Sequence, residues 1–138
     1  MQYWILKSEP DVFSFDTLIQ KGPSDWDGVR NYQARNFLKL MKKGDLAFFY
    51  HTAAERKNVG ILKIVKEFYQ DPSTEDTRWV SVRVEALQAL NHSVSIDDFK
   101  SNSVLKKSLL LRQSRLSVIP LNSEEFQTVL KLSQTKMF

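Results

Sequence analysis

The feature that most constrains the fold is a series of strand-like segments that are not separated by regular helices. These segments cover residues 2–7, 46–51, 59–69, 79–87 and 115–121. A doubly wound parallel sheet places a helix between successive strands, so this order disfavours that class. The sequence instead predicts an α+β fold, a small and mostly antiparallel β-barrel with peripheral helices.

Two of the strand segments show how they are buried. The segment 79–87 alternates, with Val80, Val82 and Val84 on one side and polar residues on the other, which is typical of a half-buried antiparallel strand. The segment LAFFYH, 46–51, is apolar throughout and is therefore expected to be buried on both faces. Gly60 inside the strand 59–69 indicates a bulge or a close backbone approach.

The expected helices begin at residues that can cap them. Ser14 and Asn31 precede helices over 15–20 and 32–43, and Ser95 and Asn122 precede two later helices. The stretch 23–30, PSDWDGVR, is expected to be a loop. No repeat or linker interrupts the chain, so we expect a single domain over residues 1–138.

Composition limits the environment of the chain. It has 138 residues without cysteine, which excludes disulfides and cysteine-based zinc sites and fits a reducing cytoplasm. No apolar run approaches the roughly 18 residues of a membrane span, so no membrane partner is expected. The net charge of +4 permits an anionic partner without requiring one.

Motifs for catalysis or metal binding are missing from the sequence. His51 and His92 are the two histidines, and neither belongs to a metal-binding pattern. The glycines are isolated, so phosphate-binding loops are absent, and Ser8 lacks a nucleophile-elbow context. We therefore expect no catalytic residue, metal or cofactor. The alternative of an enzyme would rely on His51 or Glu9 as a general base.

Residues 26–35 combine an aromatic ring, an amide and two cations. Trp26 is either a core side chain or a platform on which a base stacks, and such stacking contributes roughly 1–3 kcal/mol per base. Asn31 is either a helix cap alone or also a contact to a base edge. Arg30 and Arg35 are either solvated charges or phosphate contacts near a helix N-terminus.

Other candidate residues lie where strands end. Lys7 and Ser8 form either a plain turn before Pro10 or part of the mouth of a barrel. Tyr50 and His51 lie at the polar end of a second strand and could face the same cavity. Two further arginines bracket a loop and are either surface charges or a phosphate clamp; they are Arg112 and Arg115.

Several strings of the sequence resemble one known family. The strings YWILKSEP, WDGVRNYQARNFLKLMKKGDLAFFYH, VGILKIVKE, DPS, RW and LLLRQSRLSV occur in this order from about residue 2 to 130. Together they resemble the EVE domain family of the PUA-like superfamily, which is related to the YTH and ASCH domains. The resemblance implies a PUA-like fold, a bent and mostly antiparallel β-barrel with peripheral helices, and a pocket for a nucleotide base.

The resemblance also implies roles for the candidate residues. Trp26 matches a tryptophan of an aromatic cage, and Asn31 lies near a base-contacting asparagine. Lys7 and Ser8 match contacts at a strand end, and Tyr50 and His51 match the floor of the pocket. The phosphate backbone is then expected to be held by four arginines: Arg30, Arg35, Arg112 and Arg115.

These roles lead to the expectation of a non-enzymatic, monomeric reader of a modified nucleobase in DNA or RNA. The alternative is an RNA-binding accessory domain that recognises structured RNA without reading a modification. Two departures from the family bear on specificity. Thr52-Ala53 replaces the Ser-Asn pair that often follows the histidine, and the segment DPSTEDTRW is shorter than in many members.

Overall fold

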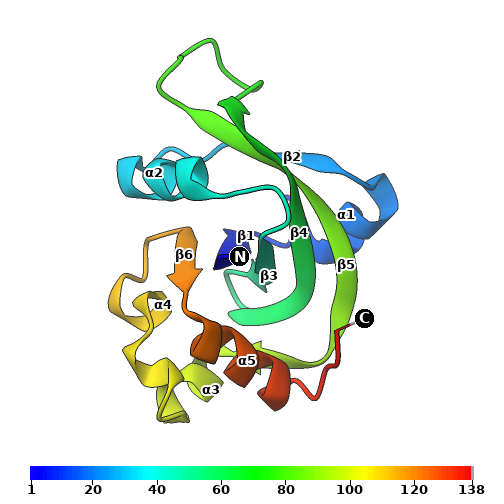
Figure 1. The fold of residues 1–138 in the computed structure, drawn as a ribbon, viewed down its shortest axis with the longest axis vertical. Coiled ribbons are helices and arrows are strands. Elements are labelled where there is room, and N and C mark those ends of the chain that lie inside the picture. The colour runs from blue at the N-terminus through cyan, green and yellow to red at the C-terminus, as the bar shows by residue number, and fades with distance from the viewer. Residues whose placement is uncertain (138) are drawn as a thin grey trace.

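The computed structural model describes residues 1–137, and within that range six strands form one curled sheet, an open half-barrel surrounded by helices (Figure 1). The predicted α+β class is thereby confirmed. The strands are β1 (Tyr3–Ser8), β2 (Ser24–Trp26), β3 (Leu46–His51), β4 (Lys57–Gln70), β5 (Val80–Ser95) and β6 (Val118–Leu121). The helices are α1 (Phe15–Lys21), α2 (Tyr32–Leu40), α3 (Ile96–Ser101), η1 (Leu105–Lys107), α4 (Leu109–Arg112) and α5 (Ser123–Leu132).

The strand order is β2-β5-β4-β3-β1-β6, and one pair in it is parallel. β1 runs parallel to β3, with Tyr3 opposite Leu46 and Ser8 opposite His51, while the other pairs are antiparallel. Parallel strands end at the same edge of a sheet, so the carboxyl ends of β1 and β3 lie side by side. The crossover between them, residues 9–45, carries α1, β2 and α2.

β4 and β5 form a long bent hairpin that gives the sheet its curl (Figure 1). The register shifts near Asn58 and Gly60, so the predicted irregularity at Gly60 is confirmed. A Cβ atom on Gly60 would lie 2.3 Å from Cζ of Phe15. Phe15 is itself buried, so only glycine lets the first helix pack this closely on the strand.

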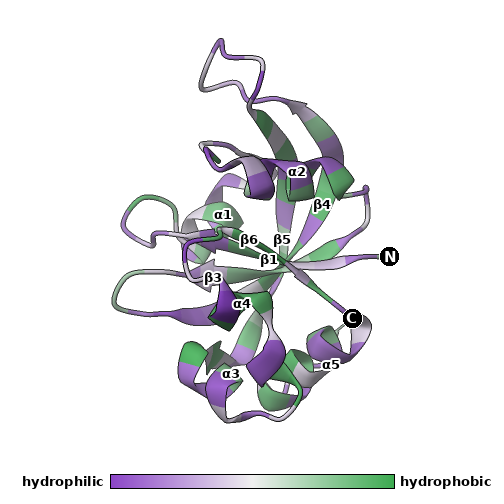
Figure 2. Ribbon diagram, turned by 90° about the vertical axis from the view of Figure 1, so that its left-hand side faces the viewer, coloured by the Kyte–Doolittle hydropathy of each residue, from purple (hydrophilic) through white to green (hydrophobic). Residues whose placement is uncertain are grey.

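The core lies inside the curl of the sheet. Its largest fully buried side chains include Trp4, Phe48, Phe49 and Phe126. β3 contributes to both faces, since residues 47–50 are all buried, as its continuous apolar sequence predicts. The surrounding helices mix hydrophobic and hydrophilic residues along their length (Figure 2). Phe126 of α5, for example, stacks on Phe48 at a centroid distance of 4.7 Å.

The predicted helix caps are confirmed. The side chain of Ser14 accepts a hydrogen bond from the Thr17 amide, and Asn31 accepts one from Ala34. Ser95 and Asn122 each form a capping box, with Asp98 and Glu125 as the third helical residue. Short polar side chains satisfy the free amide groups of a first helical turn, which is why these starting points can be read from sequence.

Several predicted boundaries are wrong, among them the start of the last strand, which lies at Val118 rather than at residue 115, and three have identifiable reasons. The expected loop 23–30 contains β2, whose three residues are too few to show a periodic pattern. α2 ends at Leu40 rather than at residue 43, because Asp45 accepts the Lys42 amide and draws the chain into a turn. β5 continues to Ser95, where pairing with β4 holds a polar segment that lacks a strand pattern. Among the described helices, none is both long and apolar enough to cross a membrane.

Candidate functional site

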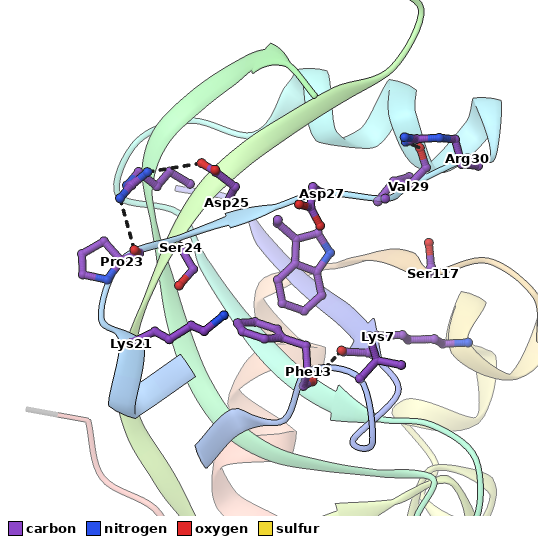
Figure 3. Close-up of a pocket in the computed structure, with 15 residues that line it drawn as sticks. Lys7, Phe13, Lys21, Pro23, Ser24, Asp25, Asp27, Val29, Arg30 and Ser117 are labelled. Carbon is purple, nitrogen blue, oxygen red and sulfur yellow. Dashed lines mark hydrogen bonds and ion pairs between the residues drawn. The ribbon is translucent and has the colours of Figure 1, made fainter. Parts of the chain in front are cut away.

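An open cavity of about 600 Å³ lies between the end of β1 and the segment that contains β2 (Figure 3). Three elements of the crossover line it: the turn before α1, the end of α1, and residues 23–30. Its lining consists of Lys7, Ser8, Val12, Phe13, Lys21, Pro23, Ser24, Asp25, Trp26, Asp27, Gly28, Val29, Arg30, Arg83 and Ser117. We call it the first cavity. Its volume falls within the roughly 300–1,000 Å³ typical of small-molecule sites.

Trp26 forms an aromatic wall of the first cavity while remaining largely part of the core. Its side chain is 6% exposed and packs edge-on against Phe49 and Phe13, with centroid distances of 5.3 and 6.1 Å. Pairing of β2 with β5 places Trp26 opposite Val82. The ring therefore belongs to the core and also lines the cavity, so its role as a stacking platform stays a prediction.

Two aspartates flank Trp26 and differ in their partners. Asp25 lies opposite Arg83 on β5 and pairs with its guanidinium at 3.2 Å, and it also accepts a hydrogen bond from the hydroxyl of Tyr69. Asp27 lines the first cavity without such a partner among the described residues. Burial, together with the negative charges of Asp71 and Asp25, raises the pKa of Asp27 above its ordinary value of 3.8.

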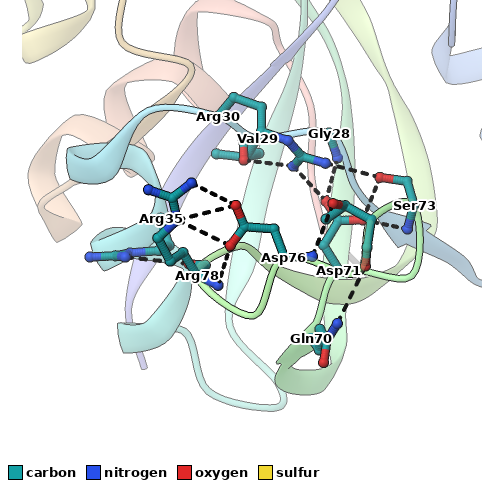
Figure 4. A network of polar contacts seen from close by, with 10 residues as sticks. Gly28, Val29, Arg30, Arg35, Gln70, Asp71, Ser73, Asp76 and Arg78 are labelled. Atoms are coloured by element: carbon teal, nitrogen blue, oxygen red, sulfur yellow. Dashed lines mark hydrogen bonds and ion pairs between the residues drawn. The ribbon is translucent and has the colours of Figure 1, made fainter.

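The segment after β2 is fixed by Asp71, which follows β4 (Figure 4). The carboxylate of Asp71 is buried and accepts hydrogen bonds from the Gly28 amide at 2.8 Å, from Arg30 at 2.8 Å and from Ser73. Burial alone would raise the pKa of Asp71, but these hydrogen bonds outweigh it and lower the pKa to about 2. The network holds residues 28–30 in place beside the cavity.

A ridge made of Lys7, Ser8 and Ser117 bounds the first cavity on the side of β1. The Lys7 amide donates to the Ser117 carbonyl at 3.0 Å, and the Ser8 carbonyl accepts from the Thr52 amide at 3.0 Å. The Ser8 hydroxyl donates to the Phe13 carbonyl at 2.6 Å. These bonds make the ridge rigid. We call it the dividing ridge, because a second cavity lies beyond it.

The second cavity has a volume of about 560 Å³ and shares the dividing ridge with the first. Its remaining lining consists of Glu9, Tyr50, Thr52, Ala53, Arg56, Ile96, Leu110, Ser114 and Arg115. Tyr50 is 3% exposed, so only a small part of its side chain reaches the surface. The ammonium group of Lys7 lies 5.6 Å from the Tyr50 ring centroid and donates to the Ser114 carbonyl. Burial lowers the pKa of Lys7.

The structure thus divides the predicted base-binding residues. Lys7 and Ser8 line both cavities, Trp26 lines the first, and Tyr50 lines the second. Asn31 lines neither cavity, and its side-chain oxygen Oδ1 already caps α2 by accepting from the Ala34 amide. His51 also lies outside both cavities.

Both ring nitrogens of His51 are engaged within the protein. Nε2 lies 3.1 Å from the amide nitrogen of Phe15, and Nδ1 lies 3.0 Å from a carboxylate oxygen of Glu55. A backbone amide can only donate, so Nε2 is the acceptor and Nδ1 carries the proton. In this arrangement His51 fixes the start of α1 against the end of β3.

The four predicted phosphate-binding arginines also lie in different environments. Arg30 lines the first cavity but is paired with Asp71, and Arg115 lines the second cavity. Arg35 lies outside both, bonded to Asn36 and over the Tyr32 ring at 4.9 Å. Arg112 is exposed at the end of α4 and lines neither cavity.

Several site residues were not foreseen from sequence. Asp27 follows Trp26 directly in the sequence, and that adjacency was the available signal. Arg56, Asp71 and Ser117 reach the site only through contacts between distant segments, which single-sequence patterns do not reveal. Among residues 1–137, no group of three or more metal-ligating side chains lies close enough to hold a metal ion.

A curled half-barrel surrounded by helices, with an aromatic-walled cavity at its strand ends, defines a class of small α+β domains. The model of the EVE domain family matches residues 2–132, and the chain belongs to that family. Mouse (Mus musculus) thymocyte nuclear protein 1 is 37% identical over 168 aligned positions, which cover 97% of this chain and 74% of that protein. The aligned length exceeds the 138 residues here, so the mouse protein carries additional residues within the domain.

Solved structures share the fold. Human THYN1, crystallised in complex with DNA containing 5-methylcytosine, superposes with a TM-score of 0.90 at 35% identity, covering 99% of both chains. A YTH domain from Zygosaccharomyces rouxii superposes with a TM-score of 0.58 at 13% identity over 99% of this chain and 90% of that one, which shows a common fold. The predicted relation to YTH domains is therefore confirmed at the level of architecture. The expected cytoplasmic location stays a prediction.

Proposed function

We propose that this chain is a nucleic-acid-binding domain that accommodates one modified nucleobase in the first cavity. The observation that carries the proposal is Trp26, whose ring forms a wall of an open cavity of about 600 Å³. Edge-on packing against Phe49 holds that ring in one orientation. A base that stacks on a ring already held in place loses little side-chain entropy on binding.

Polar groups around Trp26 suit the edge of a base that carries an exocyclic amino group. Asp27 lines the cavity and offers a carboxylate acceptor, the group that pairs with the amino group of cytosine. Lys7 and Ser8 supply further polar groups on the dividing ridge. Turning a base out of a duplex costs a few kcal/mol, which one stacking contact and two hydrogen bonds can offset.

The similarity to human THYN1 supports modified DNA as the first ligand to test. That protein was crystallised with DNA containing 5-methylcytosine, and it matches this chain over 99% of its length at 35% identity. A methyl group fitted against an apolar wall contributes roughly 1–3 kcal/mol of selectivity. Val29 and Phe13 are the apolar neighbours of Trp26 in the cavity lining that can supply such a wall.

We propose binding without catalysis. His51, the histidine considered as a general base, uses both ring nitrogens to hold Phe15 and Glu55. The other candidate base, Glu9, lines the second cavity rather than the first. Neither group is placed to remove a proton from a base stacked on Trp26.

The proposal is tested by titrating the protein with matched single-stranded and duplex oligonucleotides that differ only in one methylated cytosine, in DNA and in RNA. Trp26→Leu should lower affinity for the modified oligonucleotide roughly five- to a hundredfold, as expected for loss of base stacking. Phe126→Leu is the matched control, because it also removes a buried ring, one that stacks on Tyr3 and Phe48. Melting curves of both variants establish that each remains folded.

Equal affinity for modified and unmodified ligands, unchanged by Trp26→Leu in a folded variant, would exclude the base-cavity function. A strong preference for folded RNA regardless of modification would instead support the RNA-binding alternative.

A further inference from the structure

A single base bound in the first cavity would leave the second cavity empty. The two cavities meet at the dividing ridge, since Lys7, Ser8 and Ser117 line both. A polymer that places one unit in the first cavity can therefore continue across the ridge into the second. Each cavity has a volume of several hundred cubic ångströms, about 600 Å³ and 560 Å³.

The two cavities differ in the state of their arginines. In the first, Arg30 is paired with Asp71 at 2.8 Å and Arg83 with Asp25 at 3.2 Å. In the second, Arg56 and Arg115 have no side-chain hydrogen bond or ion pair within residues 1–137. Glu9 is the carboxylate of that lining, so the two arginines outnumber it even before Lys7 is counted. A phosphate in the second cavity therefore meets two unpaired arginines, whereas both arginines of the first cavity are held by carboxylates.

The backbone of Arg56 is held in place beside the second cavity. Arg56 has a left-handed conformation with φ of 46°, and its carbonyl accepts a hydrogen bond from the Ile96 amide at 3.0 Å. The positive charge of Arg56 also lowers the pKa of Tyr50, although burial of the hydroxyl outweighs it and raises that pKa overall. Arg56 is therefore close enough to act on the buried floor of the cavity.

We propose that the second cavity is a subsite for the phosphodiester backbone next to the base held in the first cavity, with Arg56 and Arg115 as its phosphate contacts. This inference rests on the proposed function, because the base in the first cavity sets the register of the strand. The ligand class is accordingly an oligonucleotide rather than a free base. The dividing ridge separates the part that reads the base from the part that holds the strand.

The test combines Arg56→Gln and Arg115→Gln in one protein and measures affinity for the methylated and unmethylated oligonucleotides across a range of salt concentrations. Loss of two phosphate contacts to a single strand should lower the slope of log affinity against log salt by about 1.4, and affinity at 0.1 M salt roughly ten- to thirtyfold. The ratio of affinities for methylated and unmethylated ligands should stay the same. Lys106→Gln with Lys131→Gln is the control, because both are exposed, carry the same charge and line neither cavity.

The outcomes separate this inference from the proposed function. If the folded double arginine variant keeps the salt-dependence slope and the affinity of the wild-type protein, the backbone subsite is overturned, whatever the effect of Trp26→Leu. An equal loss in the lysine control would also overturn it, because the effect would then follow from net charge. Two results together support both the backbone subsite and the proposed function. The arginine variant should lose affinity while the ratio of affinities for methylated and unmethylated ligands stays the same. Trp26→Leu should lose that ratio.

Discussion

Asp27 carries its negative charge where burial and two neighbouring carboxylates disfavour it. A group held in an unfavourable charge state beside a cavity is typical of functional sites, where binding uses a charge that folding alone would avoid. Asp25, one residue earlier, is by contrast compensated by Arg83. Both aspartates line the first cavity, but Asp25 is paired within the protein, and Asp27 is the one that we propose contacts a base.

Replacing Asp27 with alanine should stabilise the fold and weaken binding. The pKa of Asp27 is raised in the folded state, so its charge destabilises the fold above that pKa and has no effect well below the ordinary value of 3.8. The gain in unfolding free energy should therefore be present at pH 7 and vanish near pH 3. Urea unfolding at both pH values, with oligonucleotide titration at pH 7, measures the two effects. A variant that is less stable at pH 7 would contradict the argument.

Position 53 shows how a residue can matter through its backbone. Ala53 has a left-handed conformation with φ of 59°, which glycine and asparagine adopt more easily than alanine. The resemblance to the EVE family implies asparagine at this position in many members. The backbone conformation is a sufficient reason for that asparagine, so its absence from this chain does not by itself remove a contact to a base.

Ala53→Gly and Ala53→Asn should each raise the free energy of unfolding by about 0.5–1 kcal/mol, because they relieve the left-handed alanine. Ala54→Gly is the control, since Ala54 is an exposed neighbour without a positive φ. Chemical denaturation measures the difference. If Ala53→Asn instead left stability unchanged and raised affinity for the oligonucleotide, the residue would act as a ligand contact.

At the scale of elements, the site depends on a link between the end of β4 and the segment after β2. Asp71 makes this link by accepting hydrogen bonds from Gly28 and Arg30, more than forty residues earlier in the chain. The carboxylate touches no ligand in the proposed arrangement. It holds the backbone next to Trp26, so its effect on binding is indirect.

Asp71→Asn should destabilise the protein by about 2–3 kcal/mol, because the buried carboxylate that pairs with the partly exposed Arg30 is replaced by an amide that cannot accept all of these bonds. Affinity for the oligonucleotide should fall as well, because residues 28–30 lose their support. Asp76→Asn is the control, since Asp76 belongs to the same turn and pairs with Arg78 at the surface. Equal effects of the two substitutions would show that the link through Asp71 is unimportant.

The elements that were predictable from sequence are those with local signals. Ser14, Asn31, Ser95 and Asn122 cap helices through bonds to the residue three positions later, so the pattern is visible in the sequence. β2 was missed because its existence depends on pairing with β5, almost sixty residues later. The end of α2 was missed because Asp45 accepts a hydrogen bond from the Lys42 amide and so draws the chain into a turn.

The candidate site was predictable only in part, for the same reason. Trp26, Lys7 and Ser8 belong to strings with a recognisable composition, and the structure brings them to one cavity. Tyr50 was placed in the same pocket, but the dividing ridge puts it in the second cavity. Such a separation arises from three segments meeting in space, and composition alone does not encode it.

At the scale of the whole molecule, acid should destabilise the fold in a defined range. The pKa of Asp71 is lowered to about 2 in the folded state from an ordinary value of 3.8, so its contribution is fully present above pH 4 and is lost as the pH falls toward 2. The difference corresponds to about 2 kcal/mol of unfolding free energy. Urea midpoints measured from pH 5 to pH 2 should fall in the unmodified protein, and Asp71→Asn should reduce that fall. An equally steep fall in the variant would assign the acid sensitivity to other groups.

The two outermost strands of the sheet have a consequence for how the molecule meets its neighbours. β2 has three residues and β6 has four, one of them Pro120, which has no amide hydrogen to donate. β6 thus exposes only a short length of unpaired backbone at its margin, which gives another chain little to extend by strand addition. At the other margin β2 pairs only with residues 82–84 of the longer β5, so β5 sets the length of that edge. Fusion of a further domain beside β6 should therefore be tolerated without strand addition there.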